Sequence, residues 1–167
     1  MVALQAILVP IDGSAPSLAA LEHAIVLAED GDTRVDILRV DVPDELGVEP
    51  VSSLAPDARL EIERAFDDAV ERARAHLDGR VSARAASGDP GRTIIETARD
   101  GRYDLIVIGT HGRTGRLHVL LGSVAEEVVR NAPCPVLTVR DTSDGYQSFA
   151  ERRHGRPSVA EQVSRRP

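Results

Sequence analysis

Short apolar runs alternate with amphipathic segments along most of the chain. The run AILVP, at residues 6–10, is continuously apolar, as expected for a strand that is buried on both faces. The predicted strands cover residues 6–10, 34–42, 80–86, 104–108 and 136–140. Because a helical segment follows each of the first four, the pattern predicts right-handed crossovers and an open parallel five-stranded sheet with helices on both faces.

The predicted helices have apolar residues three and four positions apart. Ser14 can cap the first helix, which ends before Gly31, and the second helix ends at Gly79. Asp89 and the proline after it suit the cap and first turn of the third helix. The fourth is predicted over residues 123–131.

The charge is distributed unevenly along the chain. Residues 1–140 carry 23 acidic residues and 15 arginines, whereas residues 141–167 carry 4 and 5. An acidic folded part argues against nucleic acid and anionic membranes as partners. No apolar run approaches the roughly 20 residues of a membrane span, and the first apolar stretch is too short for a signal peptide. We expect one cytoplasmic domain over residues 1–140 and a disordered polar tail over 141–167.

The composition also excludes several kinds of chemistry. All twenty basic residues are arginine, so the chain has no P-loop lysine, no kinase lysine and no Schiff base. Cys134 is the only cysteine, which excludes an internal disulfide and favours a small apolar filler between two prolines. His111 and His118 have no third ligand at a suitable spacing, so we expect no zinc site and no catalytic residue.

A glycine-rich segment follows the fourth predicted strand. Gly109 and Gly112 lack a Cβ, so the backbone there can approach a ligand closely. Gly122 and Ser123 open a helix, where free N–H groups and the helix dipole favour phosphate. In such sheets, ligands bind at the carboxyl ends of strands where the strand order reverses. If the first and fourth strands are neighbours, Asp12 faces the same crevice, and the sequence predicts a nucleotide pocket.

These residues also have plainer structural explanations. Asp12 could simply hold a turn with Gly13, and Val40 could be a core residue with one edge towards the pocket. Ser123 and Glu126 match a capping box, which needs no ligand and is compatible with phosphate binding.

The charged residues in and after the glycine segment would have opposite effects on a bound phosphate. Glu126 and Glu127 would repel a triphosphate if they pointed into the pocket. Arg113 and Arg116 could offset this repulsion as phosphate partners, or they could only solvate an exposed loop.

Three parts of the sequence together resemble the universal stress protein family. They are PIDGS at residues 10–14, the GxxGx9GS frame over residues 109–123, and the ending SVAEEVVRNAPCPVLTVR. The resemblance covers about residues 3–140, and the complete glycine frame resembles the family's ATP-binding branch. It implies a flavodoxin-like, Rossmann-like sheet of order 3-2-1-4-5, a homodimer, and ATP or AMP in the crevice.

The resemblance also implies roles for single residues. Asp12 would lie on the side of the ribose or of a Mg²⁺ ion, and Val40 on the side of the adenine. Gly109 and Gly112 would meet the ribose and phosphates. The full implied set of nucleotide-binding residues is Pro10, Ile11, Asp12, Val40, Ile108, Gly109, His111, Gly112, Arg113, Gly122, Ser123 and Val124.

The two edges of the predicted sheet differ. Arg80 and Arg84 protect the third strand against edge pairing, whereas the last strand is apolar. We expect a two-fold dimer through this last strand. Its residues are Val136, Leu137, Thr138 and Val139. The alternative is that the tail covers this edge.

Three classes of function follow. The first is a regulatory nucleotide-binding module in the stress response that acts on a protein partner. The second is an enzyme, such as a slow Mg²⁺-dependent ATPase, but the segment DGSAP after the first strand lacks the SGG or HxGH signature of related transferases. The third is a dimeric adaptor without nucleotide. The sequence favours the first and disfavours a dedicated catalyst.

Overall fold

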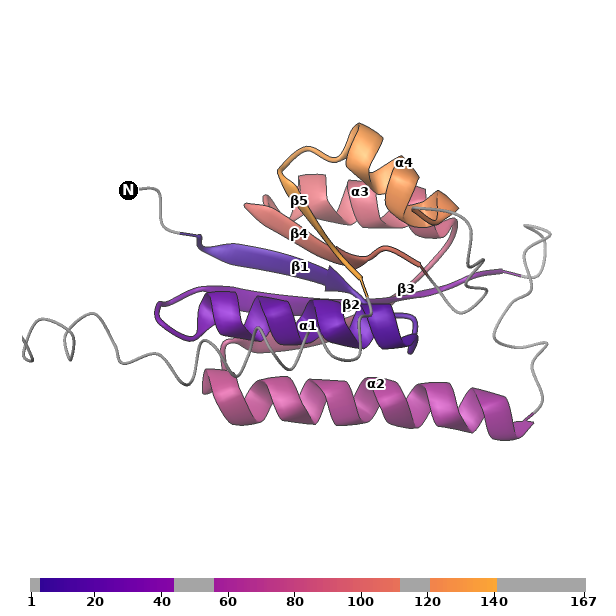
Figure 1. Cartoon of the computed structure of the whole chain (residues 1–167), viewed down its shortest axis with the longest axis horizontal. Coiled ribbons are helices and arrows are strands. Elements are labelled where there is room, and N and C mark those ends of the chain that lie inside the picture. The colour runs from indigo at the N-terminus through magenta and orange to yellow at the C-terminus, as the bar shows by residue number, and fades with distance from the viewer. Residues whose placement is uncertain (1–3, 44–55, 112–120, 141–167) are drawn as a thin grey trace, which may run out of the picture.

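The computed structural model describes residues 4–43, 56–111 and 121–140 (Figure 1). Its elements are β1 (Ala6–Pro10), α1 (Ala15–Ala28), β2 (Arg34–Asp41), α2 (Pro56–Leu77), β3 (Val81–Ser87), α3 (Pro90–Asp100), β4 (Leu105–Gly109), α4 (Ser123–Asn131) and β5 (Val136–Val139). The strands form one parallel sheet of order β3-β2-β1-β4-β5. The predicted fold class and strand order are confirmed.

Helices cover the sheet from both sides. In Figure 1, α1 and α2 lie below the sheet, and α3 and α4 lie above it. Side chains alternate along the strands, so Ile7 and Ile37 enter the core under α1 and α2, whereas Leu8 and Leu38 enter the core under α3 and α4. All four are fully buried. This double coverage explains why the β1 run is continuously apolar.

Most strands end one residue away from the predicted positions. β1 and α4 have the predicted bounds, but β2 ends at Asp41 and β3 runs from Val81 to Ser87. Asp41 is the register partner of Ser87, so the two strands end together. Strand ends thus follow the neighbouring strand, which the pattern of one segment does not contain.

The helix starts use different caps. The Asp89 carboxylate accepts a hydrogen bond from the Arg92 backbone N–H (2.9 Å), which confirms the predicted cap of α3. Ser14 occupies the N-cap position of α1, but its side chain makes no capping bond. Its hydroxyl instead donates to Asp12 Oδ1 (2.5 Å).

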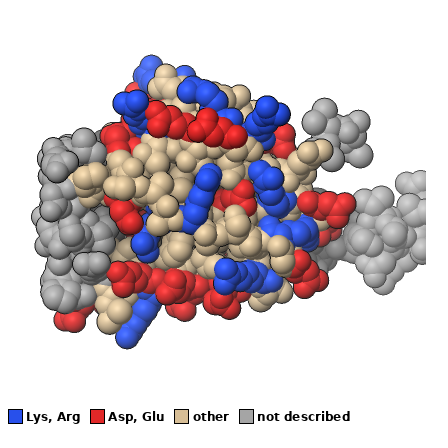
Figure 2. Space-filling model, turned by 180° about the vertical axis from the view of Figure 1, so that it is seen from behind, with Lys and Arg blue, Asp and Glu red and all other residues tan. Residues whose placement is uncertain are grey.

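The longest helix, α2, is charged over most of its surface. Val70 and Leu77 pack into the core, and Arg72 donates to Glu22 of α1 (2.7 Å). Figure 2, seen from the side opposite to Figure 1, shows rows of acidic side chains along the upper and lower margins, with α2 at the lower one. Across the described ranges, we find no helix with enough length and apolar character to cross a membrane.

Cys134 is half-buried and packs against the core under α3 and α4. Burial raises the pKa of its thiol, which favours the neutral form. The predicted role as a small apolar filler is confirmed.

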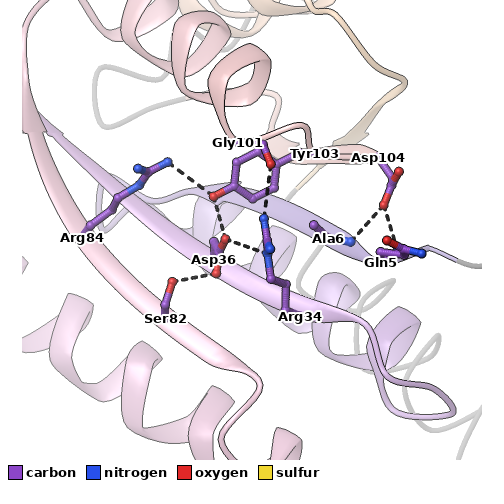
Figure 3. Close-up of polar contacts among 9 residues, drawn as sticks. All are labelled: Gln5, Ala6, Arg34, Asp36, Ser82, Arg84, Gly101, Tyr103 and Asp104. Carbon is purple, nitrogen blue, oxygen red and sulfur yellow. Dashed lines mark hydrogen bonds and ion pairs between the residues drawn. The ribbon is translucent and has the colours of Figure 1, made fainter.

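A polar cluster lies on the α3 side of β2 and β3, at the start of these strands (Figure 3). Asp36 is buried, and its carboxylate accepts hydrogen bonds from the hydroxyls of Ser82 and Tyr103, both at 2.6 Å. The Arg34 guanidinium lies 3.2 Å from the same carboxylate. Arg84 donates to the Tyr103 hydroxyl (3.3 Å). The cluster ties the connection between α3 and β4 to the surface of β2.

Tyr103 makes the stability of the protein change with pH in the alkaline range. Burial and the hydrogen bond to Asp36 raise the pKa of Tyr103 to about 12, from 10.0 when exposed. The folded state therefore favours the neutral phenol, and this stabilisation is present below pH 10 and is lost as the pH rises towards 12.

We expect the free energy of unfolding of the wild-type chain to fall over this range more steeply than that of Tyr103→Phe. Urea titrations at a series of pH values measure the difference. Parallel curves for the two proteins would contradict it.

Candidate functional site

The predicted ligand position is the switch point of the sheet, where the carboxyl ends of β1 and β4 lie side by side. The two strands are paired neighbours, with Ile7 opposite Leu105, as the predicted switch point requires. The chain leaves β1 towards α1 on one face and leaves β4 towards α4 on the other. The Ser14 hydroxyl at the start of α1 donates to the His111 carbonyl (3.4 Å), across 97 positions in the sequence. The structure therefore brings the two predicted segments together.

Asp12 forms a tight turn at the end of β1. Its Oδ1 accepts hydrogen bonds from the backbone N–H (3.0 Å) and the hydroxyl of Ser14. Gly13 between them has φ +82°, a conformation that favours glycine. The structural explanation of Asp12 is confirmed, and the turn holds its carboxylate beside the switch point. Ser14 was missed as a site residue, although its position two residues after an aspartate was a signal.

Gly109 is required by the packing of α1. A Cβ at this position would lie 2.7 Å from the carbonyl carbon of Pro16 and 2.8 Å from the backbone nitrogen of Ser17. The lack of a Cβ at Gly109 therefore allows the first turn of α1 to pack closely against the end of β4. Contact between Gly109 and a ligand stays a prediction.

Thr110 connects three elements through its backbone. Its N–H donates to the carbonyl of Val139 at the end of β5 (2.8 Å), and its carbonyl accepts from the N–H of Gly122 (2.7 Å). The residue is almost fully buried. Gly122 packs so closely that a Cβ there would lie 3.2 Å from the Thr110 carbonyl oxygen. Thr110 was not predicted as a site residue, and no motif in the sequence marks it.

The predicted capping box at the start of α4 is wrong. Gly122, which has no side chain, is the N-cap, so Ser123 is the first helical residue and not the cap. The Glu126 carboxylate accepts from Arg130 (2.8 Å) instead of reaching back to the helix start. The SxxE pattern is out of register by one residue, because the hydrogen bond from Gly122 to Thr110 fixes where the helix begins.

Both acidic residues in the first turns of α4 are engaged by neighbours. Arg130 pairs with Glu126 and partly neutralises it. The carboxylate of Glu127 packs directly over Gly91, in the first turn of α3. Glu126 therefore lies along α4 beside Arg130, and Glu127 lies against the start of α3.

The predicted apolar site residues fall into two groups. Pro10, Ile11 and Ile108 are buried, so a ligand would reach them through the backbone. Val40 and Val124 are half-buried beside the core under α3 and α4. They form an apolar flank on that side of the sheet.

The remaining predicted site residues are placed only in part. The Nδ1 atom of His111 lies 3.1 Å from the Thr110 hydroxyl. Gly112 and Arg113 lie outside the described residues, as do Arg116 and His118. Within residues 4–43, 56–111 and 121–140, no group of three or more histidine, cysteine, aspartate or glutamate residues is arranged to hold a metal ion.

The predicted dimer strand is the edge strand β5. Val139 is buried and Val136 is half-buried, whereas Leu137 and Thr138 are exposed. The exposed large apolar residues of the two helices that contact this strand are Leu27 on α1 and Val129 on α4.

Comparison with known proteins agrees with this fold. The sequence model of the universal stress protein family matches residues 4–140. Universal stress protein MJ0531 of Methanocaldococcus jannaschii is 38% identical over 138 residues, which cover 80% of this chain and 81% of that protein. The solved structure of universal stress protein UspA from Lactobacillus plantarum superimposes with a TM-score of 0.70 at 25% identity, covering 84% of this chain and all of that one.

A second solved structure is described as a universal stress protein in complex with cAMP. It has a TM-score of 0.64 and 27% identity, and the match covers 83% of this chain and 98% of that one. The sequence match extends over all five strands, and the strand order is the one observed in the structure. The chain therefore belongs to the universal stress protein family.

Proposed function

We propose that this protein is a regulatory module of the stress response that holds ATP or AMP at the carboxyl ends of β1 and β4. The observation that carries the proposal is the convergence of the Asp12 turn, His111 and the start of α4 at one switch point of the sheet. The cAMP complex of the related protein supports a nucleotide as the class of ligand.

The parts of the crevice match the parts of a nucleotide. The half-buried side chains of Val40 and Val124 suit an apolar base. The Asp12 carboxylate suits a ribose hydroxyl or a Mg²⁺ ion, which prefers oxygen ligands. The first backbone N–H groups of α4, from Ser123 onwards, have no partner within the helix and suit phosphate.

The state of the Ser123 hydroxyl favours this assignment. Because Gly122 is the N-cap, the exposed Ser123 stands at the first helical position, where its hydroxyl can donate to a phosphate oxygen. Gly112 and Arg113 are further proposed contacts, as the glycine frame implies. With no lysine in the chain, phosphate would be held by backbone N–H groups, hydroxyls and arginine.

We also propose a homodimer through β5. The strand presents Leu137 and Thr138 at an edge of the sheet, and the flanking helices present Leu27 and Val129. An apolar edge of this kind invites pairing with a second copy, and a two-fold axis would bury the same patch on both.

Replacement of Gly122 tests the nucleotide site. In Gly122→Val, a branched Cβ placed 3.2 Å from the Thr110 carbonyl oxygen displaces the start of α4. We expect at least about a tenfold loss of ATP affinity, or roughly 1.4 kcal/mol. Calorimetric titration of the full chain with ATP, ADP and AMP, with and without Mg²⁺, measures this loss.

The matched control is Gly31→Val, because a Cβ at Gly31 comes no closer than 3.8 Å to another residue. This variant should bind like the wild type. Absence of nucleotide binding by the wild-type chain would favour the adaptor function, and steady release of phosphate from ATP would favour the ATPase. Unchanged affinity in Gly122→Val would refute the phosphate site.

A further inference from the structure

The outer edge of β3 is open among the residues that the structure describes. β3 ends the sheet on the side opposite to β5 and pairs with β2 along its whole length. The Arg80 carbonyl accepts from the N–H of Val35 (2.8 Å), and the Gly88 N–H donates to the carbonyl of Asp41 (3.0 Å). Even-numbered residues of this segment therefore turn their backbone groups to β2. The residues that turn theirs outward are Val81, Ala83, Ala85 and Ser87.

Protection of this edge by Arg80 and Arg84 stays a prediction, because both guanidinium groups are engaged away from the outer side of β3. The Arg80 guanidinium turns back to the carbonyls of residues 28, 31 and 33, at the end of α1 and in the turn after it. The Arg84 guanidinium lies over the α3 side of the sheet, where it donates to the Tyr103 hydroxyl. Natural sheet edges are commonly blocked by charged side chains, by proline or by a bulge. β3 contains no proline, its register with β2 is unbroken, and its one charged side chain, Arg84, is turned to Tyr103.

The surface on the α2 side of this edge is acidic. Arg72 lies on the side of α2 that faces α1, where it donates to a glutamate of that helix. Asp67 and Glu71 lie on the other side of the apolar stripe that packs into the core. Both acidic residues are exposed, and Glu71 accepts a hydrogen bond from Arg74 on the same side (3.0 Å). Asp78 follows at the end of the helix, so this side keeps an acidic excess. Acidic side chains line the lower margin of Figure 2, where α2 lies.

The part of the α3 side that adjoins the edge is basic, and an acidic row lies beyond it along the upper margin of Figure 2. Arg84 and Arg34 flank Asp36 there, so two guanidinium groups surround one carboxylate (Figure 3). Both arginines are exposed to solvent. A strand added beside β3 would point alternate side chains towards the two faces of the sheet. It would therefore meet acidic groups on one face and an excess of basic charge on the other.

A second copy of the chain does not fit this edge. Antiparallel pairing of two β3 strands about a two-fold axis places α2 beside its own symmetry mate. The acidic rows with Asp67 and Glu71 would then face each other, in a chain that already carries a net charge of −7. A segment that binds beside β3 must instead carry charges that complement both faces of the sheet.

We propose that the β3 edge binds an extended segment of a partner protein in which basic and acidic residues alternate. The segment would add to the sheet as a further strand through the outward backbone groups of β3. Its lysine or arginine side chains would lie towards Asp67 and Asp78, and its carboxylates towards Arg84. The surface is separate from the nucleotide crevice and does not depend on it.

Two peptides of the same composition test the charge pattern. One alternates lysine and glutamate along its length, and the other has the same residues in two blocks. We expect the alternating peptide to bind the full chain at least about tenfold more tightly, since only it satisfies both faces. Hydrogen exchange should show new protection at the amides of Ala83 and Ala85. Equal binding of the two peptides, or protection elsewhere only, would overturn the proposal.

Replacement of Ala85 tests the backbone pairing. Ala85→Pro removes an outward N–H and leaves the hydrogen bonds to β2 in place, since proline is tolerated at the solvent side of an edge strand. It should weaken binding at least about tenfold, whereas the control Ala85→Val retains the N–H and should bind like the wild type.

The alternating peptide with N-methylated backbone groups gives the same test without any change to the protein. Methylation removes the peptide's own donors, so this peptide should not bind. Undiminished binding by this peptide would overturn the proposal, even if Ala85→Pro did not fold.

Discussion

Gly109→Ala is expected to lower the free energy of unfolding by about 3 kcal/mol, at the upper end of the usual range for overpacking. The added Cβ would lie 2.7 to 2.9 Å from backbone atoms of Pro16 and Ser17. These atoms belong to the first turn of α1, which cannot move without disturbing the Asp12 turn. Urea unfolding of the variant and the wild type measures the change.

The control for this prediction is Gly31→Ala. A Cβ at Gly31 has only the Thr33 hydroxyl nearby, at 3.8 Å, so this variant should lose little stability. Equal stability of the two variants would mean that α1 is not packed against Gly109 as the structure has it. A Gly109→Ala protein that folds should also bind nucleotide more weakly, because the turn that holds Asp12 is displaced.

Asp36→Ala is expected to lower the free energy of unfolding by about 2 kcal/mol, since the buried Tyr103 hydroxyl loses its acceptor, whereas the exposed Ser82 can turn to water. Ser82 and Tyr103 both donate to this carboxylate at 2.6 Å. The half-exposed Arg34 contributes little to the loss, because its charge remains solvated. The change is measured as a shift of the urea midpoint at neutral pH.

Asp36→Asn separates the hydrogen bonds from the charge. The amide keeps one acceptor oxygen in place, so this variant should lose about half as much stability as Asp36→Ala. If the alanine variant unfolded at the wild-type midpoint, the cluster would have no net stabilising role.

The succession of strands and helices along the chain could be predicted because each apolar run is bounded by strong turn residues, whereas the strand order in the sheet was implied by the family resemblance. The bounds were less accurate where a neighbouring strand decides them, as in β3, which extends to Ser87 opposite Asp41. The polar cluster around Asp36 was not predicted. A single aspartate in an apolar strand does not reveal that a serine on β3 and a tyrosine after α3 donate to it.

The candidate site could be predicted in part, because its glycines and Asp12 have strong local preferences. Gly109 was predicted to let a ligand approach the backbone. In the structure, the backbone of α1 approaches it, which gives this glycine a packing role that was not predicted. Thr110 and the Ser14 contact to His111 could not be predicted, because they depend on backbone groups that only the folded sheet brings together. The wrong capping box has the same origin, as the bond to Thr110 displaces the helix start by one residue.

The central position of β1 has a consequence for how the protein folds. β1 is the first strand of the chain, but one of its two neighbours is β4, about a hundred residues later. Contacts between segments so far apart in sequence form late, because the intervening chain must close first. Half of the chain cannot form the switch point, so a nascent protein gains the proposed nucleotide site only after β4 has been synthesised and has docked beside β1.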